Sequence, residues 1–476
     1  MQKNGMSYVI YGASGGGRKV YYTLKNTGLD IDFFVDGDCS KWGSCFEGKD
    51  VKNPEEIDKN KHLIIIASEL SQEAIEEKLT NLGLYNNIIM KEEILLPHLW
   101  EIETEYLSEE KVEINNEKSV FIELLEGTPK GAGGIVSWSM NVASILLESN
   151  IYARILATGK FPFPKGKEKL FQEVETSYGT YWEDVIKLVG VMEKELPCVI
   201  ILNKQMQMLY AAILLKRKYP EYVKIVSVVH SDAICLYKRS NIIQEYIDIF
   251  IGITGYIKNR LVQSNISKEK IAYKEMPIPD CFMKKRIYSE NINKIKIGYA
   301  GRLEIMPKRA DLLIELIKQL ELEKIPYEFH IAGTGTYYNK IKEYLIQNSL
   351  EQKVILYGQL PREKMPVFWH NKDVFIAVSD KEGCCLSMME AMAAGAVPVV
   401  TNFSVSNEYI SVPGNGYVVT FGDMKMMAGV IGKLYINPDI IKEKSIACME
   451  YMKLHCSYNS YTDFLLNLIN KISRIL

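Results

Sequence analysis

The sequence predicts an α/β protein made of doubly wound parallel sheets, arranged as three consecutive blocks. Short apolar runs that suit buried strands alternate with helical patterns along most of the 476 residues. Such alternation is typical of βα units. The chain is also too long for one hydrophobic core, so about three domains are expected. The expected segments are a first block at 1–100, a linker at 101–118, a second block at 119–285, a third block at 286–455 and a final helix at 456–476.

The first block is expected to form a small parallel sheet. A glycine turn, 12–17, follows the first strand and leads into a helix that ends near Lys25. A second helix is expected at 71–82. Residues 101–118 are rich in Glu and Lys without apolar periodicity, which is typical of a linker. The expected strands lie at 7–11, 31–36, 62–67 and, as a short fourth strand, 88–90.

The second and third blocks repeat the same alternation. In the second, a glycine turn at 131–134 joins a strand to a helix at 135–149, and the weakly patterned segment 157–185 is interpreted as a long loop or an insertion. Two doubly wound halves that face each other form a cleft at their carboxyl-end loops, where a ligand is expected. Strands are expected at 119–125, 198–202, 224–229, 294–299, 327–332, 353–357, 373–378 and 397–401, and helices at 309–321, 337–348, 362–370 and 457–472.

Composition excludes several functional classes. The formal net charge of −2 argues against a nucleic-acid-binding protein. Nine scattered cysteines lack metal-ligand spacing, so a zinc site is not expected and a reducing cytoplasm is the simplest setting. The first residues predict a strand and a turn rather than a signal peptide. No apolar run approaches the roughly 20 residues of a spanning helix, so any membrane contact is expected to be peripheral.

The segment 382–395, EGCCLSMMEAMAAG, predicts a turn that runs into a helix. Glu382 lies in the turn and Glu390 about two helical turns further on. The amides and dipole of a helix start attract phosphate, and carboxylates accept hydrogen bonds from sugar hydroxyls. A nucleotide-sugar could be held in this way. The alternative is an alanine-rich surface helix with two chance glutamates.

Two cations follow the first strand of the third block. Arg302 and Lys308 stand in the loop after that strand, where together they could neutralise a diphosphate. Charge-assisted hydrogen bonds of this kind contribute roughly 1.5–3 kcal/mol each. The alternative is a pair of solvated surface cations.

An ordered set of motifs carries a family resemblance. The third-block motifs are GRLEIMPKRADLLIEL (301–316), HIAGTGTYYNKIKEYL (330–345), VILYGQLPREKMPVFWHNKDVFIAVSD (354–380), PVVTNFSVSNEYI (398–410) and NGYVV followed by GD (415–423). With the two glutamates, these motifs resemble the C-terminal domain of GT-B glycosyltransferases of the large retaining family 4, also called glycosyl transferases group 1. The second block resembles the family more weakly, through GAGG at 131–134, VVHSD at 228–232 and GITGYIKNRLVQ at 252–263. The resemblance implies two facing Rossmann-like domains and a last helix that returns to the first of them.

The same resemblance assigns roles to single residues. Glu390 should hold the ribose hydroxyls and Glu382 the donor sugar. His230 is a candidate for contact with donor sugar or acceptor, although a strand-end histidine can also be structural. Glycines 133 and 134 would let their loop approach the donor phosphates, or would only form a tight turn. Main-chain groups that would face the donor belong to Gly133, Gly134, Gly301, Gly383, Cys384, Cys385 and Leu386.

Two positions depart from the family pattern. Cys385 and Arg309 stand where the family often has glycine. The substitution at Cys385 is tolerable if only its amide is used, but it puts the shape of the sugar pocket in doubt. Cys384 and Cys385 are interpreted as packing residues rather than nucleophiles.

The implied chemistry needs no metal and no cofactor beyond the nucleotide-diphosphate sugar that serves as co-substrate. Arg302, Lys308 and the helix start would stabilise charge on the leaving diphosphate. Retention of configuration is implied by the family, and the leaving phosphate can deprotonate the acceptor without a protein base. The D-x-D strings, Asp30/Asp32 and Asp36/Asp38, lie in the first block and are interpreted as strand-end acids.

The first block carries a second, weaker nucleotide pattern. Gly12, Gly15 and Gly17 give G-x-x-G-x-G rather than the strict dinucleotide fingerprint, and Asp36 follows about twenty residues on. The block resembles the small Rossmann-like domain that precedes bacterial sugar acyltransferases. A nucleotide site and a docking or oligomerisation role both remain open.

The sequence therefore predicts a retaining, hexosyltransferase-type glycosyltransferase for bacterial surface polysaccharide, with a glycan, lipid-linked or protein acceptor. The alternatives are a GT-B sugar-nucleotide epimerase and a non-catalytic nucleotide-sugar-binding scaffold. Residues 160–171 mix Lys with Phe and Pro, which suits peripheral contact with the inner membrane face, or simply a solvated loop.

Overall fold

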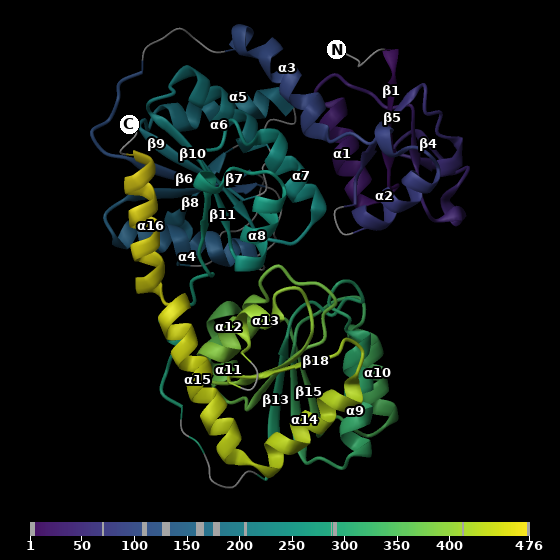
Figure 1. Ribbon diagram of the computed structural model, residues 1–476, viewed down its shortest axis with the longest axis vertical. Coiled ribbons are helices and arrows are strands. Elements are labelled where there is room, and N and C mark those ends of the chain that lie inside the picture. The colour runs from purple at the N-terminus through teal and green to yellow at the C-terminus, as the bar shows by residue number, and fades with distance from the viewer. Residues whose placement is uncertain are drawn as a thin grey trace.

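Three sheets follow one another along the chain in the computed structural model, one in each expected block (Figure 1). The first block lies beside the second, and the third lies across from the second. This arrangement confirms the α/β class and the extra N-terminal sheet. The structure describes residues 5–68, 71–106, 112–125, 134–158, 166–174, 181–203, 207–286, 288, 293–411 and 414–473.

The first sheet has the strand order β3-β4-β2-β1-β5. An antiparallel hairpin, β3 and β4, was not predicted, because it has only two residues on one side and no apolar run. The expected strand at 88–90 is wrong, since Ile88 makes only an isolated bridge to Ile64. The strands are β1 (Ser7–Tyr11), β2 (Phe33–Val35), β3 (Cys45–Phe46), β4 (Lys49–Lys52) and β5 (His62–Ile66), and the helices are α1 (Gly15–Lys25) and α2 (Gln72–Asn81).

A helix occupies the start of the expected linker. α3 (Lys91–Tyr106) buries Leu95 and Leu99 completely, and it packs against two helices of the second block, α6 (Gln207–Lys218) and α7 (Ile234–Ile243). Its N-terminal half carries the apolar spacing, whereas the Glu-rich half at 101–106 suggested a linker from the composition alone. The first block is therefore joined to the second by a packed helix.

The second sheet is parallel throughout, in the order β12-β11-β10-β9-β6-β7-β8. The loop expected across 157–185 is wrong in part, because this stretch holds β8 and the beginning of α5. The polar alternation of a short edge strand explains why β8 was missed. The strands are β6 (Ser119–Leu125), β7 (Tyr152–Thr158), β8 (Phe171–Val174), β9 (Cys198–Leu202), β10 (Val223–Val229), β11 (Ile249–Gly252) and β12 (Ile271–Tyr273), and the further helices are α4 (Gly134–Glu148), α5 (Tyr181–Glu193) and α8 (Gly255–Gln263).

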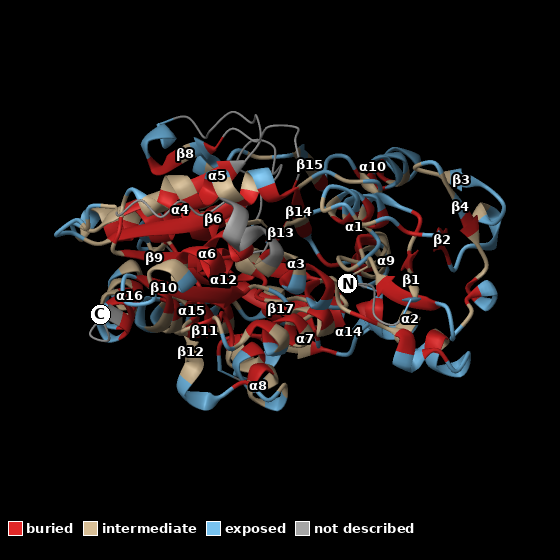
Figure 2. Cartoon of the chain, turned by 90° about the horizontal axis from the view of Figure 1, so that it is seen from above, coloured by how far each residue is buried: buried red, intermediate tan, exposed pale blue. Residues whose placement is uncertain are grey.

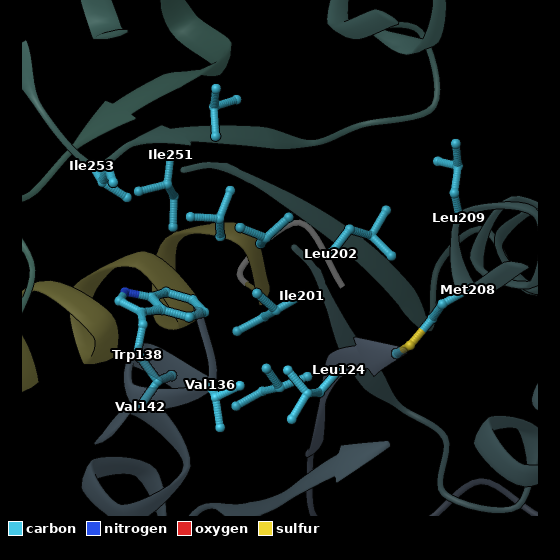
Figure 3. Close-up of a cluster of buried hydrophobic side chains, with 14 of the residues drawn as sticks. Leu124, Val136, Trp138, Val142, Ile201, Leu202, Met208, Leu209, Ile251 and Ile253 are labelled. Carbon is cyan, nitrogen blue, oxygen red and sulfur yellow. The ribbon is translucent and has the colours of Figure 1, made fainter. Parts of the chain in front are cut away.

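The strands at the centre of the second sheet are buried on both faces (Figure 2), which is why their sequences are mostly apolar, with Lys224 and Ser227 of β10 as exceptions. Trp138 and Val142 of α4 lie in one buried cluster with Ile201 of β9 and Ile251 of β11 (Figure 3). Burying such a side chain contributes about 1.5–3 kcal/mol. The cluster makes this sheet a rigid platform for the loops at its carboxyl edge.

The third sheet has the order β15-β14-β13-β16-β17-β18. Its neighbours β13 and β16 are not consecutive in the chain, so their loops diverge at a topological switch point, where open α/β sheets bind ligands. The strands are β13 (Ile295–Ala300), β14 (Tyr327–Ala332), β15 (Val354–Gly358), β16 (Val374–Ala377), β17 (Val397–Thr401) and β18 (Tyr417–Val419). The helices are α9 (Asp311–Leu322), α10 (Tyr338–Gln347), α11 (Met365–His370), α12 (Leu386–Ala393), α13 (Ser406–Tyr409), α14 (Met424–Ile436) and α15 (Pro438–Cys456).

The chain ends by crossing back to the second block (Figure 1). α15 packs on α12, the chain turns at Ser457, and α16 (Tyr458–Ser473) packs on α4. Beside the turn, the amide of Ile278 donates to the Cys456 carbonyl at 2.8 Å. Trp138 Nε1 donates to the Tyr461 hydroxyl at 3.0 Å, which fixes α16 to α4. The chain thus passes between the second and third blocks twice, near Ile278 and at Ser457, and these two segments lie side by side.

Among the helices of the described residues, none combines the length and the apolar character needed to cross a bilayer.

Candidate active site

Two loops meet at the switch point of the third sheet. Lys308, after β13, places Nζ 2.5 Å from Glu382 Oε1, after β16. Ser379 Oγ donates to the same carboxylate oxygen at 2.6 Å, and the amide of Asp380 donates to the Pro307 carbonyl at 2.9 Å. The two loops therefore form one unit, in which the lysine and the glutamate are paired.

This pair is largely shielded from water. The exposed fractions of the Lys308 and Glu382 side chains are 18% and 10%. Burial alone would lower the pKa of Lys308, but the adjacent Glu382 carboxylate raises it above its ordinary value. Arg302 is exposed and close enough for its charge to oppose that rise. Two cations, Arg302 and Lys308, thus lie near the Glu382 carboxylate.

Both departures from the family pattern occupy the left-handed backbone region. Arg309 has φ +50° and Cys385 has φ +49°. These are conformations that glycine adopts readily and that cost other residues about 1 kcal/mol or more. The turn geometry is therefore retained without glycine. Arg309 also pairs with Asp311 at 2.7 Å and stacks over the Phe421 ring at 5.1 Å, which helps to hold it there.

The thiols of Cys384 and Cys385 are buried. Burial raises the pKa of both, that of Cys385 to about 12, so neither is a thiolate at neutral pH. Cys384 packs against the Tyr409 hydroxyl at 3.8 Å. These contacts agree with packing residues rather than nucleophiles.

The start of α12 follows directly on the turn that holds Glu382. Cys385 is its N-cap residue, and no side-chain hydrogen bond caps this end among the described residues. The amides of Gly383, Cys384, Cys385 and Leu386 thus belong to a turn and first helical turn beside Lys308. Such an end attracts anions through its amides and dipole.

His230 comes to the same place from the second block. A Cβ built on Gly383 would lie 2.4 Å from the His230 carbonyl oxygen and 2.7 Å from Ser231 Cα. The donor-side turn of the third block thus touches the loop after β10. This contact brings the His230 loop and the turn of the Lys308–Glu382 pair together where the two facing domains meet.

The His230 ring is held by a buried hydrogen-bond chain. Its Nε2 lies 2.8 Å from Asn203 Oδ1, and the Trp138 ring lies edge-on at 5.1 Å. Asn203 Nδ2 donates to the Glu123 carbonyl at 2.6 Å, which orients the amide oxygen toward the histidine. His230 Nε2 must then be the donor. Sequence reasoning missed Asn203 and Glu123, since neither stands in a quoted motif.

Glu390 lies apart from the Lys308–Glu382 pair, inside α12. The carboxyl is buried, and burial raises its pKa to about 7, while Arg362 and Trp369 act in the opposite direction. Cys281 also lies near it. The structure therefore brings Arg302, Lys308 and Glu382 together and gives Glu390 a separate environment on the same helix.

The glycines of the predicted donor site differ in their surroundings. A Cβ on Gly333 would lie 1.9 Å from the Gly301 carbonyl oxygen, so the turns after β13 and β14 pack closely there. Gly134 starts α4, and a Cβ at this position would meet none of the described atoms within 4 Å. Gly133 lies outside the described residues.

In the first domain, the glycine pattern and Asp36 form a tight turn. A Cβ on Gly17 would lie 1.8 Å from the Gly12 carbonyl oxygen, and Gly12 has φ +117°. A Cβ on Gly15 would meet none of the described atoms within 4 Å. The Asp36 carboxylate accepts from the amides of Ala13 and Asp38 at 2.8 and 3.0 Å and from Lys41 Nζ at 2.9 Å. Three of its roughly four acceptor positions are thus used within the turn.

Two contacts that the sequence did not predict place the first domain at the crevice. Glu76 of α2 pairs with Lys238 of α7 at 2.5 Å, and Glu73 of α2 pairs with Lys381 at 3.3 Å. Lys381 directly precedes Glu382. One helix of the first domain therefore contacts both facing blocks.

A further unpredicted contact joins the two facing blocks. Glu408, in α13, accepts hydrogen bonds from the amides of Gly255 and Tyr256, the latter at 3.0 Å, and from the Tyr273 hydroxyl at 3.2 Å. A carboxylate of the third block thus sits at the N-terminus of α8 in the second. The segment 398–410 was recognised as a motif, but nothing in it suggested this partner.

The predicted strand-end acids of the first block are engaged with neighbours. Asp30 pairs with Lys49 at 2.7 Å, and Asp32 accepts from the Ser7 hydroxyl. Within the described ranges, no cluster of His, Cys, Asp and Glu side chains has the arrangement of a metal site.

Together the two facing domains, the switch-point crevice and the returning helix define a GT-B protein with an additional N-terminal domain. Residues 283–453 match the family Glycosyl transferases group 1, and residues 5–90 match the family C2185-like, N-terminal. The chain therefore contains a glycosyl transferases group 1 domain.

Curated relatives are distant and similar over part of their length. The putative colanic acid biosynthesis glycosyltransferase WcaL of Escherichia coli K12 is 26% identical over 187 residues, 38% of this chain and 46% of WcaL. The poly(ribitol-phosphate) alpha-N-acetylglucosaminyltransferase of Staphylococcus aureus is 28% identical over 177 residues, 37% of this chain and 35% of the relative. The alignments thus span about half or less of these two relatives.

Solved structures support the fold over a longer stretch. TarM of S. aureus superposes with a TM-score of 0.62 at 15% identity, over 75% of this chain and 99% of TarM. HepE of Anabaena, solved with UDP and glucose, superposes with a TM-score of 0.60 at 14% identity, over 75% of this chain and all (100%) of HepE. At such identity the likeness establishes the GT-B fold alone.

Proposed function

We propose that this protein is a retaining glycosyltransferase that moves a sugar from a nucleotide-diphosphate donor to a glycan or lipid-linked acceptor in bacterial surface polysaccharide synthesis. The observation that carries the proposal is the Lys308–Glu382 pair beside Arg302, at the uncapped start of α12 and against the His230 loop. The functions named for the relatives, which include colanic acid biosynthesis, point the same way.

In this proposal the crevice binds the donor through its diphosphate. Arg302 and Lys308 face the charge that develops as the diphosphate leaves, and the amides at the start of α12 add fixed dipoles. The charge is thereby stabilised by groups that are already in position, and no metal is invoked. Glu382, held by Lys308 and Ser379, keeps one carboxylate edge for hydroxyls of the donor sugar.

His230 would stand on the acceptor side. Its Nε2 is hydrogen-bonded to Asn203, which fixes the orientation of the ring at the acceptor side. The leaving phosphate, on the same face as the acceptor, takes the acceptor proton. Glu390, buried deeper in α12, would bind the ribose hydroxyls of the donor.

Peripheral membrane contact and self-association through the first domain stay predictions. Residues 160–165 of the Lys- and Phe-containing segment lie outside the described residues. Of the described remainder, Leu170 and Phe171 are buried, so they belong to the fold rather than to a membrane-facing surface.

The full chain should be incubated with a panel of UDP-, GDP-, ADP- and dTDP-sugars, with and without oligosaccharide acceptors, while diphosphate release is followed. Release that depends on an acceptor supports the transferase. Arg302→Ala should lower the rate about 10²–10³-fold, whereas Lys425→Ala, an exposed cation on α14, should not. Isomerised sugar without an acceptor would indicate the epimerase, and binding without turnover the scaffold.

A further inference from the structure

A second pocket lies outside the crevice, where the first domain meets α7 and α8. Its volume is about 650 Å³, within the range of small-molecule sites. Both domains contribute to its wall. The polar and aromatic lining residues that matter here are Tyr85 and Asn86 from the first domain and Tyr237, Asn241, Arg260 and Asn265 from the second block.

Contacts connect the pocket to the place where the two facing domains meet. Tyr237 donates its hydroxyl hydrogen to Asp232 Oδ1 at 3.0 Å, and Arg260 Nε lies 3.9 Å from the same oxygen. Asp232 follows Ser231, whose Cα lies against Gly383. A continuous path of contacts therefore runs from the pocket, past the start of α7, to the donor-side turn.

Arg260 is the arginine of this pocket. Its buried Nε faces Asp232 Oδ1 at 3.9 Å, whereas 36% of the side chain is exposed. The guanidinium stacks over the Tyr237 ring at 5.2 Å, which fixes its plane. The exposed part of the guanidinium can donate to a ligand oxygen.

Two exposed lining groups suit a hydroxyl-rich ligand, beside Glu93 and the apolar side chains of Ile88, Met90, Ile234 and Ile242. The Tyr85 ring is 55% exposed and offers a flat apolar face, and the exposed amide of Asn86 can both donate and accept. Lys238 is already paired with Glu76, so the pocket lacks the paired free cations that a diphosphate needs. Aromatic faces and amides together match the alternating C–H and hydroxyl surfaces of a sugar.

We propose that this pocket binds the oligosaccharide chain of the acceptor, behind the end that receives the new sugar. The proposal rests on the proposed function and names a part of its substrate. The first domain is then part of the acceptor site. Its ion pairs to α7 and to Lys381 hold Tyr85 and Asn86 in position beside Arg260.

The test uses the full chain, an array of oligosaccharides from bacterial surface polysaccharides, and the nucleotide-sugar panel. Tyr85→Ala and Arg260→Met should each weaken oligosaccharide binding tenfold or more and leave nucleotide-sugar affinity unchanged. Tyr222→Ala, which removes a comparably exposed tyrosine elsewhere, should alter neither. In transfer assays, the two pocket variants should lose the preference for long acceptors over a single sugar.

Oligosaccharide affinity unchanged in both pocket variants, or no array member bound by the wild-type protein, would overturn the pocket assignment. Circular dichroism and nucleotide-sugar affinity show whether each variant is folded, and Tyr85, being exposed, is the safer of the two substitutions. Wild-type protein that binds no nucleotide sugar would instead contradict the proposed function, and would remove the acceptor role from the pocket as well.

Discussion

Gly383 lies directly against the main chain of His230, so the donor-side turn of one domain and a loop of the other leave no room between them. A methyl group on Gly383 would come within 2.4 Å of the His230 carbonyl oxygen. Real Cβ atoms do not approach backbone so closely, and backbone cannot swing aside as a flexible side chain can. The absence of a side chain at this position therefore permits the two domains to close.

Gly383→Ala is expected to force the two facing domains apart. Turnover should fall by at least about 10²-fold, because a misplacement near 1 Å in a catalytic site has that effect. Small-angle scattering of the donor-bound protein should show a larger radius of gyration than for the wild type. Gly190→Ala, a helical glycine with open space around it, should leave both unchanged. Normal turnover in Gly383→Ala would mean that this contact is not part of the working state.

Glu408 is expected to stabilise the same closed arrangement from a different position. Its carboxylate accepts from two amides at the start of α8, where a negative charge is favoured by about 0.3–2 kcal/mol. Glu408→Gln keeps the size and one acceptor but loses the charge. We expect the transfer rate to fall 2- to 20-fold. Added salt should lower the transfer rate of the wild type toward that of the variant, because salt screens the charge of Glu408.

Hydrogen exchange at the Gly255 and Tyr256 amides reports this contact directly. Protection should fall in Glu408→Gln and stay unchanged in Glu450→Gln, which alters an exposed glutamate of α15. Equal protection in the wild type and Glu408→Gln would remove the glutamate from any role in holding the domains.

Glu390 is expected to make stability depend on pH near neutrality. Its pKa is raised from 4.5 to about 7, chiefly by burial, with Arg362 opposing. A raised carboxyl pKa favours folding below about pH 4.5, and this contribution is lost as the pH rises through 7. Glu390→Gln cannot ionise and should lack this dependence.

The measurement compares thermal midpoints of the wild type and Glu390→Gln between pH 4.5 and 8. As the pH rises, the free energy of unfolding of the variant should increase relative to that of the wild type, by up to about 3 kcal/mol. A saturating nucleotide sugar should shrink the difference if ribose hydroxyls satisfy the ionised carboxylate. Parallel pH curves for the two proteins would contradict the raised pKa.

The sequence predicted the regular parts of the molecule and the local motifs, because both depend on short-range pattern. Apolar runs such as 198–202 and 224–229 are buried on both faces, and no polar residue interrupts the first of them. The pairing of Lys308 with Glu382 also follows from topology, since loops at the ends of adjacent parallel strands must meet.

What the sequence could not supply are contacts between distant segments. Glu408 and Gly255 are 153 positions apart, and Lys381 and Glu73 are 308 apart, so no spacing rule connects them. Asn203 and Glu123 could be identified only from the structure, in which they form the buried series of hydrogen bonds that ends at His230. The helix at the start of the expected linker was not predicted, because the second half of α3 is rich in charged residues.

Arg239→Met is expected to loosen α3 from the second block. Arg239 Nε lies 2.7 Å from Glu92 Oε1, and the two side chains are 7% and 0% exposed. Burial alone would raise the pKa of Glu92, but Arg239 brings it below its ordinary value. Without the arginine, Glu92 becomes an uncompensated buried charge, at a cost of about 3–5 kcal/mol.

Because the protein has several domains, local hydrogen exchange is a better measure here than one global unfolding curve. Amides of α3 and α7 should exchange faster in Arg239→Met, while those of the third sheet keep their protection. Replacing both partners, as Glu92→Leu with Arg239→Met, should restore much of the lost protection, since two apolar side chains leave no buried charge. If the single variant exchanged like the wild type, or the double variant were worse than the single, the ion pair would not be what secures the first domain to the rest of the chain.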